Sequence, residues 1–401
     1  MKIRYDRLLI VILGLGLIIF LISLPFRKEK MIDLSSYSID EVKEYASKYE
    51  LELEIKEEYN DSSKGSFISQ SIKKGEAINK KDKLIIVYSL GKEINYKDYN
   101  VNELGRVPIM MYHGIQNMKN SETKYTGGNI DKDGYQRTSE AFRKDLEFYY
   151  ESGYRMVRLN DYVNGNIDVE LGYSPLILTF DDGLSNNILV TDIKDGEIVI
   201  DPNSAVGILE EFKKKYPDFN VTATFFVNGN LFNQKEYNDK ILNWLVNNGY
   251  DIGNHTYNHV NFNSATSEKA ISEVARIYQK LDSIIPGKYV NILALPYGYP
   301  SKSHSNFKHI LEGSYEGYSY NTIATLRVGW ESDLSPFNTN FDKTYLKRIR
   351  AYDNNGTSFD IESSFKSLEK TRYISDGNKD TVTIKKEDKD LVKTNKKVNL
   401  Y

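Results

Sequence analysis

The most apolar stretch of the chain lies near its beginning, where 19 residues from Leu8 to Phe26 carry no charge. A run of about 20 apolar residues is long enough to cross a bilayer as a helix. Basic residues precede this run and favour a cytoplasmic N-terminus over residues 1–7, but others follow it, so charge alone does not decide the orientation. Because no small-x-small cleavage site stands near its end, the sequence predicts an uncleaved transmembrane helix over residues 8–26 rather than a signal peptide.

A short helix and three strands are predicted after this run. Ser38 begins a capping box, and apolar residues recur at helical spacing behind it. Alternating apolar residues at 51–55 predict a strand with one solvent-facing side, and further strands are expected around 67–71 and 83–89. Together these elements predict a small α+β domain over residues 32–91.

Strands and helices alternate in the rest of the chain. Buried strands are predicted at 107–112, 175–178 and 221–227, and amphipathic helices at 139–153, 206–216, 240–248 and 267–281. This alternation predicts a parallel sheet with right-handed crossovers, closed or nearly closed as a barrel. The domain is expected to span residues 105–375, after a polar linker at 92–104 and before a charged C-terminal tail at 376–401. The Thr-Val-Thr-Ile run in this tail leaves two alternatives, a solvated tail or a loosely attached edge strand.

Two groups of polar residues suggest chemistry. Asp181 and Asp182 follow the buried strand at 175–178 and precede a glycine, where the backbone must turn. Strand–helix barrels build their sites from groups at the carboxyl ends of strands. His255 and His259 are four residues apart, and on a helical turn this spacing places both imidazoles on one face, as a single metal ion requires. One Asp and two His form a three-ligand site with open positions, typical of catalytic zinc-like ions, and leave a second carboxylate as a base.

An insertion follows the two carboxylates. Residues 191–204 form a longer connection than this position requires. Asp195 and Gly196, flanked by Ile193 and Ile198, predict a small hairpin. We expect it at the mouth of the site, either as a lip that grips the substrate or as an insertion without function.

Composition excludes several classes of function. A net charge of −3 gives no sign of a nucleic acid partner. The absence of cysteine excludes disulfides, thiolate metal sites, cysteine nucleophiles and a lipoprotein anchor. Aromatic faces suit stacking on sugars, but most of the 31 tyrosines are expected in the core and on the surface without such a role.

The segments TFDDG and HTYNH resemble the first two motifs of the polysaccharide deacetylase family, the carbohydrate esterase group with the NodB homology domain. The resemblance covers residues 107–350. It implies an α/β fold of the NodB type, a distorted (β/α) barrel, with a metal ion held by Asp182, His255 and His259 and with Asp181 as the catalytic base. Zinc is expected, and cobalt, nickel or iron would suit the same ligands.

A third motif is only partly matched. Pro296, Tyr297 and Gly298 resemble the family's R-x-P-Y-G segment, which implies that they line the substrate site. Ala294 stands where the family has an arginine, so the charge that normally holds the catalytic Asp is expected to be missing. Trp330 is expected to form the hydrophobic wall against the acetyl methyl group, with a plain core position as the alternative.

The catalytic acid also departs from the family's pattern. No histidine follows His309, so the family's late catalytic histidine is absent. His113 ends the first predicted strand of the domain, in a VPIMMYH segment that resembles the opening of exopolysaccharide deacetylases. A core histidine is the usual explanation for a lone residue of this kind, but its strand-end position makes His113 our candidate for the general acid.

The small domain resembles a PASTA domain. Ile68, Gln70 and Gly75 fit part of that family's I-x-x-Q-x-P-x-x-G pattern, whereas Ile72 replaces its proline. The resemblance implies a wall-proximal spacer or a unit that binds muropeptides.

From these features we predict a single-pass membrane protein with its catalytic domain outside the cell, anchored by the N-terminal helix. Its partner would be a cell-wall or capsular glycan. The predicted activity is metal-dependent N-deacetylation of amino sugars, with peptidoglycan as the first substrate. The alternatives are a poly-N-acetylglucosamine-type exopolysaccharide as substrate and a non-catalytic wall-binding protein that retains the fold.

Overall fold

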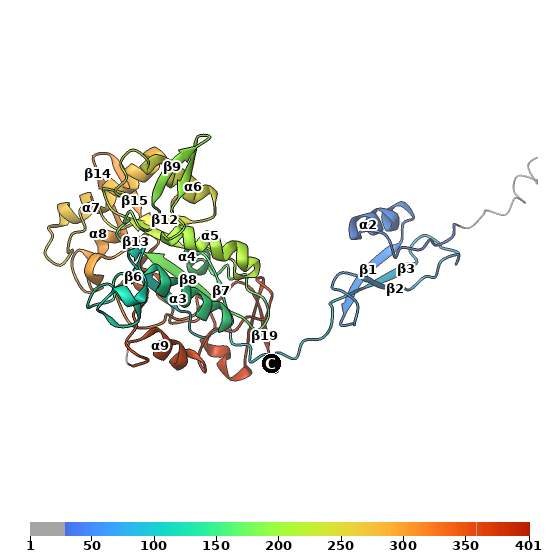
Figure 1. Ribbon diagram of the computed structural model, residues 1–401. Coiled ribbons are helices and arrows are strands. Elements are labelled where there is room, and N and C mark those ends of the chain that lie inside the picture. The colour runs from blue at the N-terminus through green and yellow to red at the C-terminus, as the bar shows by residue number, and fades with distance from the viewer. Residues whose placement is uncertain (1–28, 358) are drawn as a thin grey trace, which may run out of the picture. The chain divides into compact units, whose positions relative to one another are not determined.

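The structure, a computed structural model, describes residues 29–357 and 359–401 (Figure 1). The chain divides into two compact units, one ending at Asn95 and one running from Tyr96 to Tyr401. The predicted cytoplasmic N-terminus and transmembrane helix, residues 1–26, lie outside the described residues. Among the residues that are described, no helix is long and apolar enough to cross a membrane.

The smaller unit combines helix α2 (Ile39–Lys48) with a three-stranded sheet. In spatial order its strands are β1 (Glu52–Glu58), β3 (Lys83–Ser89) and β2 (Phe67–Gln70). The predicted capping box is confirmed, since the Ser38 hydroxyl accepts from the Glu41 N–H and the Glu41 carboxylate accepts from the Ser38 N–H. The Gln70 side chain accepts from Leu34 N and donates to Ile32 O, and so holds the start of the unit against its sheet.

The larger unit is built on a curled sheet of eight strands, all paired in parallel. In spatial order seven of them are β16 (Ala324–Leu326), β13 (Ile292–Ala294), β12 (Asp251–Asn254), β11 (Thr224–Val227), β8 (Ser174–Phe180), β4 (Ile109–Tyr112) and β17 (Ile349–Arg350), and β7 (Tyr154–Met156) pairs with β8. Leu346 bridges β16, and the same segment continues into β17, which pairs with β4. The sheet is therefore curled, and residues 346–350 connect its two ends.

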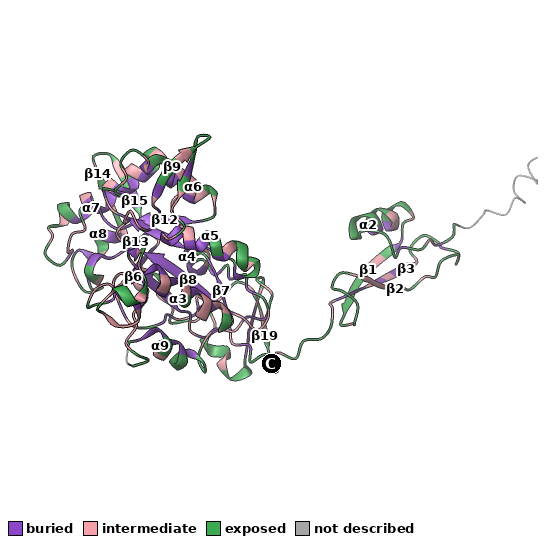
Figure 2. Cartoon of the chain, viewed as in Figure 1, coloured by how far each residue is buried: buried purple, intermediate pink, exposed green. Residues whose placement is uncertain are grey.

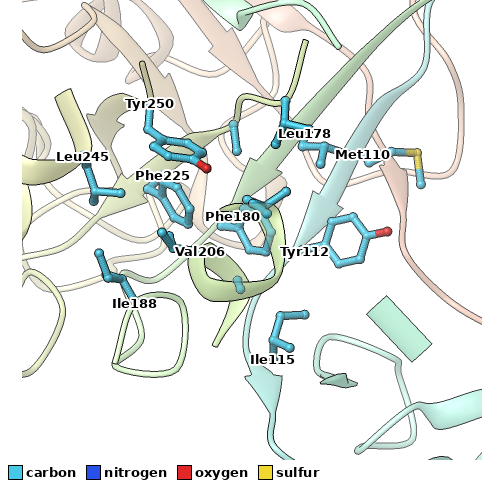
Figure 3. Packing of buried hydrophobic residues seen from close by; sticks show 14 of the residues in the cluster. Met110, Tyr112, Ile115, Leu178, Phe180, Ile188, Val206, Phe225, Leu245 and Tyr250 are labelled. Carbon is cyan, nitrogen blue, oxygen red and sulfur yellow. The ribbon is translucent and has the colours of Figure 1, made fainter. Parts of the chain in front are cut away.

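Helices surround these strands, as the alternating pattern predicts (Figure 1). They are α3 (Ser139–Glu151), α4 (Leu159–Val163), α5 (Ala205–Lys215), α6 (Asn238–Asn247), α7 (Ser267–Ile284), α8 (Phe307–Leu311) and α9 (Ile361–Leu368). Every residue of β8 is buried, so this strand lies in the middle of the unit (Figure 2). On its helix-facing side, Phe180 stacks between Tyr112 of β4 and Phe225 of β11, with ring centroids 5.4 and 4.9 Å apart (Figure 3). Since side chains alternate along a strand, Thr179 and Asp181 point to the opposite side, into the curl of the sheet.

Four short strand pairs lie outside the main sheet. They are β5 (Ile115–Gln116) with β6 (Arg137–Thr138), β9 (Val190–Lys194) with β10 (Glu197–Ile200), β14 (Glu312–Tyr315) with β15 (Tyr318–Asn321), and β18 (Thr381–Ile384) with β19 (Lys397–Leu400). The predicted hairpin with Asp195 and Gly196 in its turn is confirmed by the β9–β10 pair. None of its residues lines the pocket of the candidate site, and Ile198 and Ile200 border a separate groove with Trp244 of α6.

Of the two expectations for the C-terminal segment, the solvated tail is wrong, and the strand is present but buried and not loosely attached. Val382 and Ile384 of β18 are fully buried, because the apolar members of the Thr-Val-Thr-Ile run all point into the unit. Glu103, in the predicted linker, is buried as well and accepts hydrogen bonds from Thr383 N and from the Tyr373 hydroxyl. Residues 96–104 and 376–401 are thus integral to the larger unit.

Candidate metal centre and active site

The two carboxylates lie at the carboxyl end of β8, in a strained turn. Asp182 has φ 74° and Gly183 has φ 57°, both in the left-handed region that costs energy for residues with a Cβ. A Cβ on Gly183 would lie 2.3 Å from the carbonyl oxygen of Leu231. Only glycine fits this position, and the turn that it permits directs Asp181 and Asp182 into the same pocket.

The two histidines follow β12 in a loop, and the predicted helical turn is wrong. Thr256 and His259 have φ values of 64° and 52°, which an α-helix cannot accommodate. The loop is fixed by buried Glu273, whose carboxylate accepts from the backbone N–H and the side-chain amide of Asn258. The imidazoles converge because of these backbone kinks, with ring centroids 4.9 Å apart, and not because of helical periodicity.

Asp182, His255 and His259 together form a group that could hold one metal ion. Each offers one ligand atom, and these atoms all lie within 4.8 Å of one another. Asp182 Oδ1 lies 3.3 Å from His255 Nε2 and 3.4 Å from His259 Nε2. His255 Nδ1 lies 2.9 Å from the carbonyl oxygen of Ala294, a partner that leaves Nε2 as a free acceptor. That Nε2 atom is buried and makes no hydrogen bond, so the donor set fits a bound cation.

The electrostatics of these groups agree with that fit. Burial opposes protonation of His255, but Asp181 and Asp182 outweigh it and raise its pKa, so negative charge here attracts a proton or another cation. Burial also works against ionisation of Asp182, yet contact with His255 lowers its pKa overall. The pKa of His259 is lowered by burial and by His255, which favours the neutral imidazole that metal binding requires.

Asp181 is held by an arginine that the sequence analysis missed. The Arg348 guanidinium donates from Nη1 and Nη2 to the two carboxylate oxygens of Asp181, both at 2.7 Å. Further bonds run from Nη1 to Thr179 Oγ1 and from Nε to the carbonyl oxygen of Arg327. Both partners are almost fully buried, and although burial would raise the pKa of Asp181, Arg348 lowers it well below its usual range.

The expectation of a missing charge is therefore wrong. The arginine comes from the segment that enters β17 rather than from the Ala294 position after β13. A signal was present in the Leu-Lys-Arg-Ile-Arg run, where Arg348 and Arg350 are two positions apart and would share one face of an extended segment. Only the pairing of β17 with β4, beside β8, brings that segment next to Asp181.

A pocket of about 280 Å³ joins these residues. Its lining consists of His113, Tyr135, Gln136, Asp181, Asp182, Leu184, His255, His259, Leu295, Tyr297 and Val328. His113 follows β4, and its Nδ1 is buried and makes no hydrogen bond. Its ring contacts Tyr135 edge-on, with centroids 4.9 Å apart. Burial lowers the pKa of His113 despite the nearby carboxylates Asp181 and Asp182.

The predicted substrate-binding residues are only partly brought together. Tyr297 lines the pocket, is 57% exposed, and contacts His259 edge-on. Pro296 is buried, and Gly298 lies beside Val328, which does line the pocket. Trp330 lies outside the pocket lining, so it cannot be the wall against an acetyl methyl group. It pairs with Ile349 and its ring contacts Arg350, while Leu184, Leu295 and Val328 form the apolar wall instead.

Comparison with known families agrees with this geometry. Residues 169–309 match the family model described as polysaccharide deacetylase, and residues 29–90 match that of the PASTA domain. The chain therefore carries a domain of the polysaccharide deacetylase family and a PASTA domain, which confirms both predicted resemblances. The predicted class of enzyme, a hydrolase of this deacetylase family, is confirmed with it. The matched segment contains Asp181, Asp182, His255 and His259, whereas His113 and Arg348 lie outside it.

Solved structures of deacetylases show distant similarity. A Streptococcus pyogenes deacetylase, PplD, in complex with acetate is 18% identical, with 66% of this chain and 99% of that chain covered and a TM-score of 0.47. A de-N-acetylase from Aggregatibacter actinomycetemcomitans is 13% identical, with the same coverage and a TM-score of 0.42. No curated protein matches the chain in the sequence comparison.

Proposed function

We propose that the chain is a metal-dependent N-deacetylase that removes acetyl groups from N-acetylated amino sugars of a cell-surface polysaccharide, in the first place peptidoglycan. One observation carries this proposal: an ionised, arginine-held carboxylate and a three-ligand group with open positions share a single pocket. Hydrolysis of an amide needs a base for water and an electrophile for the carbonyl, and these two features supply them.

Asp181 is suited to the role of base. A divalent ion held by Asp182, His255 and His259 would polarise the acetyl carbonyl and lower the pKa of bound water toward about 7. Arg348 keeps Asp181 ionised, so its carboxylate can accept the proton that the attacking water loses. Leu184, Leu295 and Val328 exclude water on the apolar side of the pocket, where an acetyl methyl group fits.

His113 is the proposed proton donor to the leaving amine. Three histidines line the pocket, and His255 and His259 belong to the metal group, which leaves His113 as the donor. Burial lowers the pKa of His113, which favours the neutral imidazole before reaction. The proton that Asp181 accepts from the attacking water would pass to His113 and from there to the leaving amine, so the step needs no further proton. Loss of such an acid costs roughly 10²- to 10⁴-fold in rate, and full activity of His113→Ala would rule out this role.

The polymer is proposed from the accompanying domain. The PASTA domain at residues 29–90 supports a position beside the cell wall and hence peptidoglycan, at N-acetylglucosamine or N-acetylmuramic acid. We also propose that residues 8–26 anchor the chain in the membrane, with the catalytic domain outside. A poly-N-acetylglucosamine-type exopolysaccharide is the second candidate, favoured by the VPIMMYH segment that ends in His113.

Acetate release tests the proposal. The full-length protein would be stripped of metal with a chelator and offered peptidoglycan or, separately, chitooligosaccharide, with and without added zinc or cobalt. We expect acetate only with added metal, no acetate from Asp181→Asn, and normal release from Asp192→Asn, an exposed aspartate of the hairpin. Metal bound at about one ion per chain with no acetate from any glycan would instead favour a wall-binding protein.

A further inference from the structure

Aromatic side chains continue from the pocket toward the surface. Tyr135 lines the pocket, and Arg350 lies with its guanidinium carbon 4.6 Å from the centre of the Tyr135 ring. The same guanidinium lies 3.6 Å from the ring of Trp330. Trp330 in turn contacts Phe359, with ring centroids 4.8 Å apart. We call Tyr135, Trp330 and Phe359 the aromatic arm.

Arg350 holds this arm together. Arg350 is only 6% exposed, its Nε makes no hydrogen bond, and its Nη1 donates to the carbonyl oxygen of Asp133. The guanidinium makes cation–π contacts with the rings of both Tyr135 and Trp330. A buried guanidinium in contact with two rings restricts their movement, which lowers the cost of ordering them when a ligand binds.

The outer end of the arm is open. Phe359 is 54% exposed, so more than half of its surface is open to solvent. An exposed aromatic residue is unremarkable when isolated, but here it continues a chain of ring contacts that begins in the candidate active site. Aromatic faces pack against the apolar C–H faces of sugar rings, and the arm joins such faces to the pocket that would hold the acetyl group.

We propose that the aromatic arm binds sugar units next to the one being deacetylated, on the same polysaccharide chain. This inference rests on the proposed function and deepens it, since it makes the enzyme selective for polymers over short oligosaccharides. The occupant is the substrate chain itself, because the arm is continuous with the pocket through Tyr135.

The first test compares substrates of different length. Phe359→Ala should lower kcat/KM on a hexasaccharide of N-acetylglucosamine by roughly 3- to 10-fold, the range of one aromatic contact, and leave the disaccharide within about twofold. As a control, Tyr99→Ala removes an aromatic side chain that is about as exposed as Phe359, and it should leave kcat/KM unchanged on both the hexasaccharide and the disaccharide. An equal loss on both lengths, or no loss on either, would overturn the proposal.

A second test does not depend on catalysis. The chain has two tryptophans, so Trp244→Phe leaves Trp330 as the sole indole reporter. In Trp244→Phe/Asp181→Asn, kept in a detergent without sugar head groups, the hexasaccharide should change the fluorescence of Trp330 and the disaccharide should not. Adding Phe359→Ala should weaken the apparent affinity for the hexasaccharide by a similar 3- to 10-fold.

The outcomes separate this proposal from the one on which it rests. A length-dependent fluorescence change without acetate release from any glycan would support the arm and reject the deacetylase function. Acetate release without a fluorescence change of Trp330 would support the deacetylase function and reject the role of the arm. A Phe359→Ala variant that changed the mass of the particle in solution would show that the arm contacts a second copy, and would overturn the proposal.

Discussion

Removal of the guanidinium of Arg348 should damage stability and catalysis together. Arg348 is fully buried and Asp181 is 1% exposed, so Arg348→Met would leave a buried carboxylate without its charge partner. Breaking a buried ion pair in this way costs about 3–5 kcal/mol of the free energy of unfolding. Arg348→Lys keeps the charge but loses the two parallel hydrogen bonds, so we expect a smaller loss.

The pH dependence of this effect follows from the sign of the pKa shift. The folded-state pKa of Asp181 lies below its unfolded value near 3.9, so the stabilisation by the pair is present above about pH 4 and is lost as the pH falls below it. In Arg348→Met burial is no longer opposed by the guanidinium, and the pKa of Asp181 rises. The base is then protonated over part of the working range, which moves the acid limb of the kcat/KM profile to higher pH.

Two measurements check this reasoning, namely denaturant unfolding at pH 7 and kcat/KM against pH for acetate release. Arg137→Met is a matched control, because Arg137 forms a similarly buried pair with Asp145 but does not line the pocket. It should lower stability without moving the acid limb. In Arg348→Met/Asp181→Asn the unpaired charge is gone, and stability should partly recover. An Arg348→Met protein with wild-type stability and an unmoved acid limb would refute the assigned role of the pair.

Three further outcomes are expected. Gly183→Ala should unfold the site or abolish activity, because the new Cβ would collide with a backbone oxygen at a position of positive φ. Gly196 also has positive φ but lies in open space, so Gly196→Ala should lower the free energy of unfolding in urea by only about 1 kcal/mol. Val328→Ala should raise the rate on an N-propionyl substrate relative to an N-acetyl substrate by roughly 10-fold, because room for one methylene is worth about 1–3 kcal/mol of binding. An unchanged ratio of the two rates would exclude Val328 from the wall that contacts the acyl group. Deletion of residues 376–401 removes fully buried Val382 and should lower the free energy of unfolding by several kcal/mol or prevent folding. A truncated chain that is as stable as the full chain in thermal unfolding would contradict the place of this segment in the core.

The sequence alone determined the groups that carry chemistry. A buried apolar strand that ends in two acids and a glycine is a local pattern, and β8 with its strained turn follows directly from it. The helices, the capping box of Ser38 and the hairpin with Asp195 and Gly196 in its turn are likewise local, because spacing, caps and turn residues act within a few positions along the chain.

Only the tertiary structure decided how distant segments share one site. Arg348 reaches Asp181 because β17 pairs with β4, which in turn pairs with β8, and no pattern within either segment encodes that neighbourhood. Trp330 is not part of the acetyl wall that the sequence predicted. It forms a bridge with Ile349, and its ring contacts Arg350. Local periodicity fixes which face of an element is apolar, whereas the partner of that face is set by packing between different segments, which for Asp181 and Arg348 lie 167 residues apart.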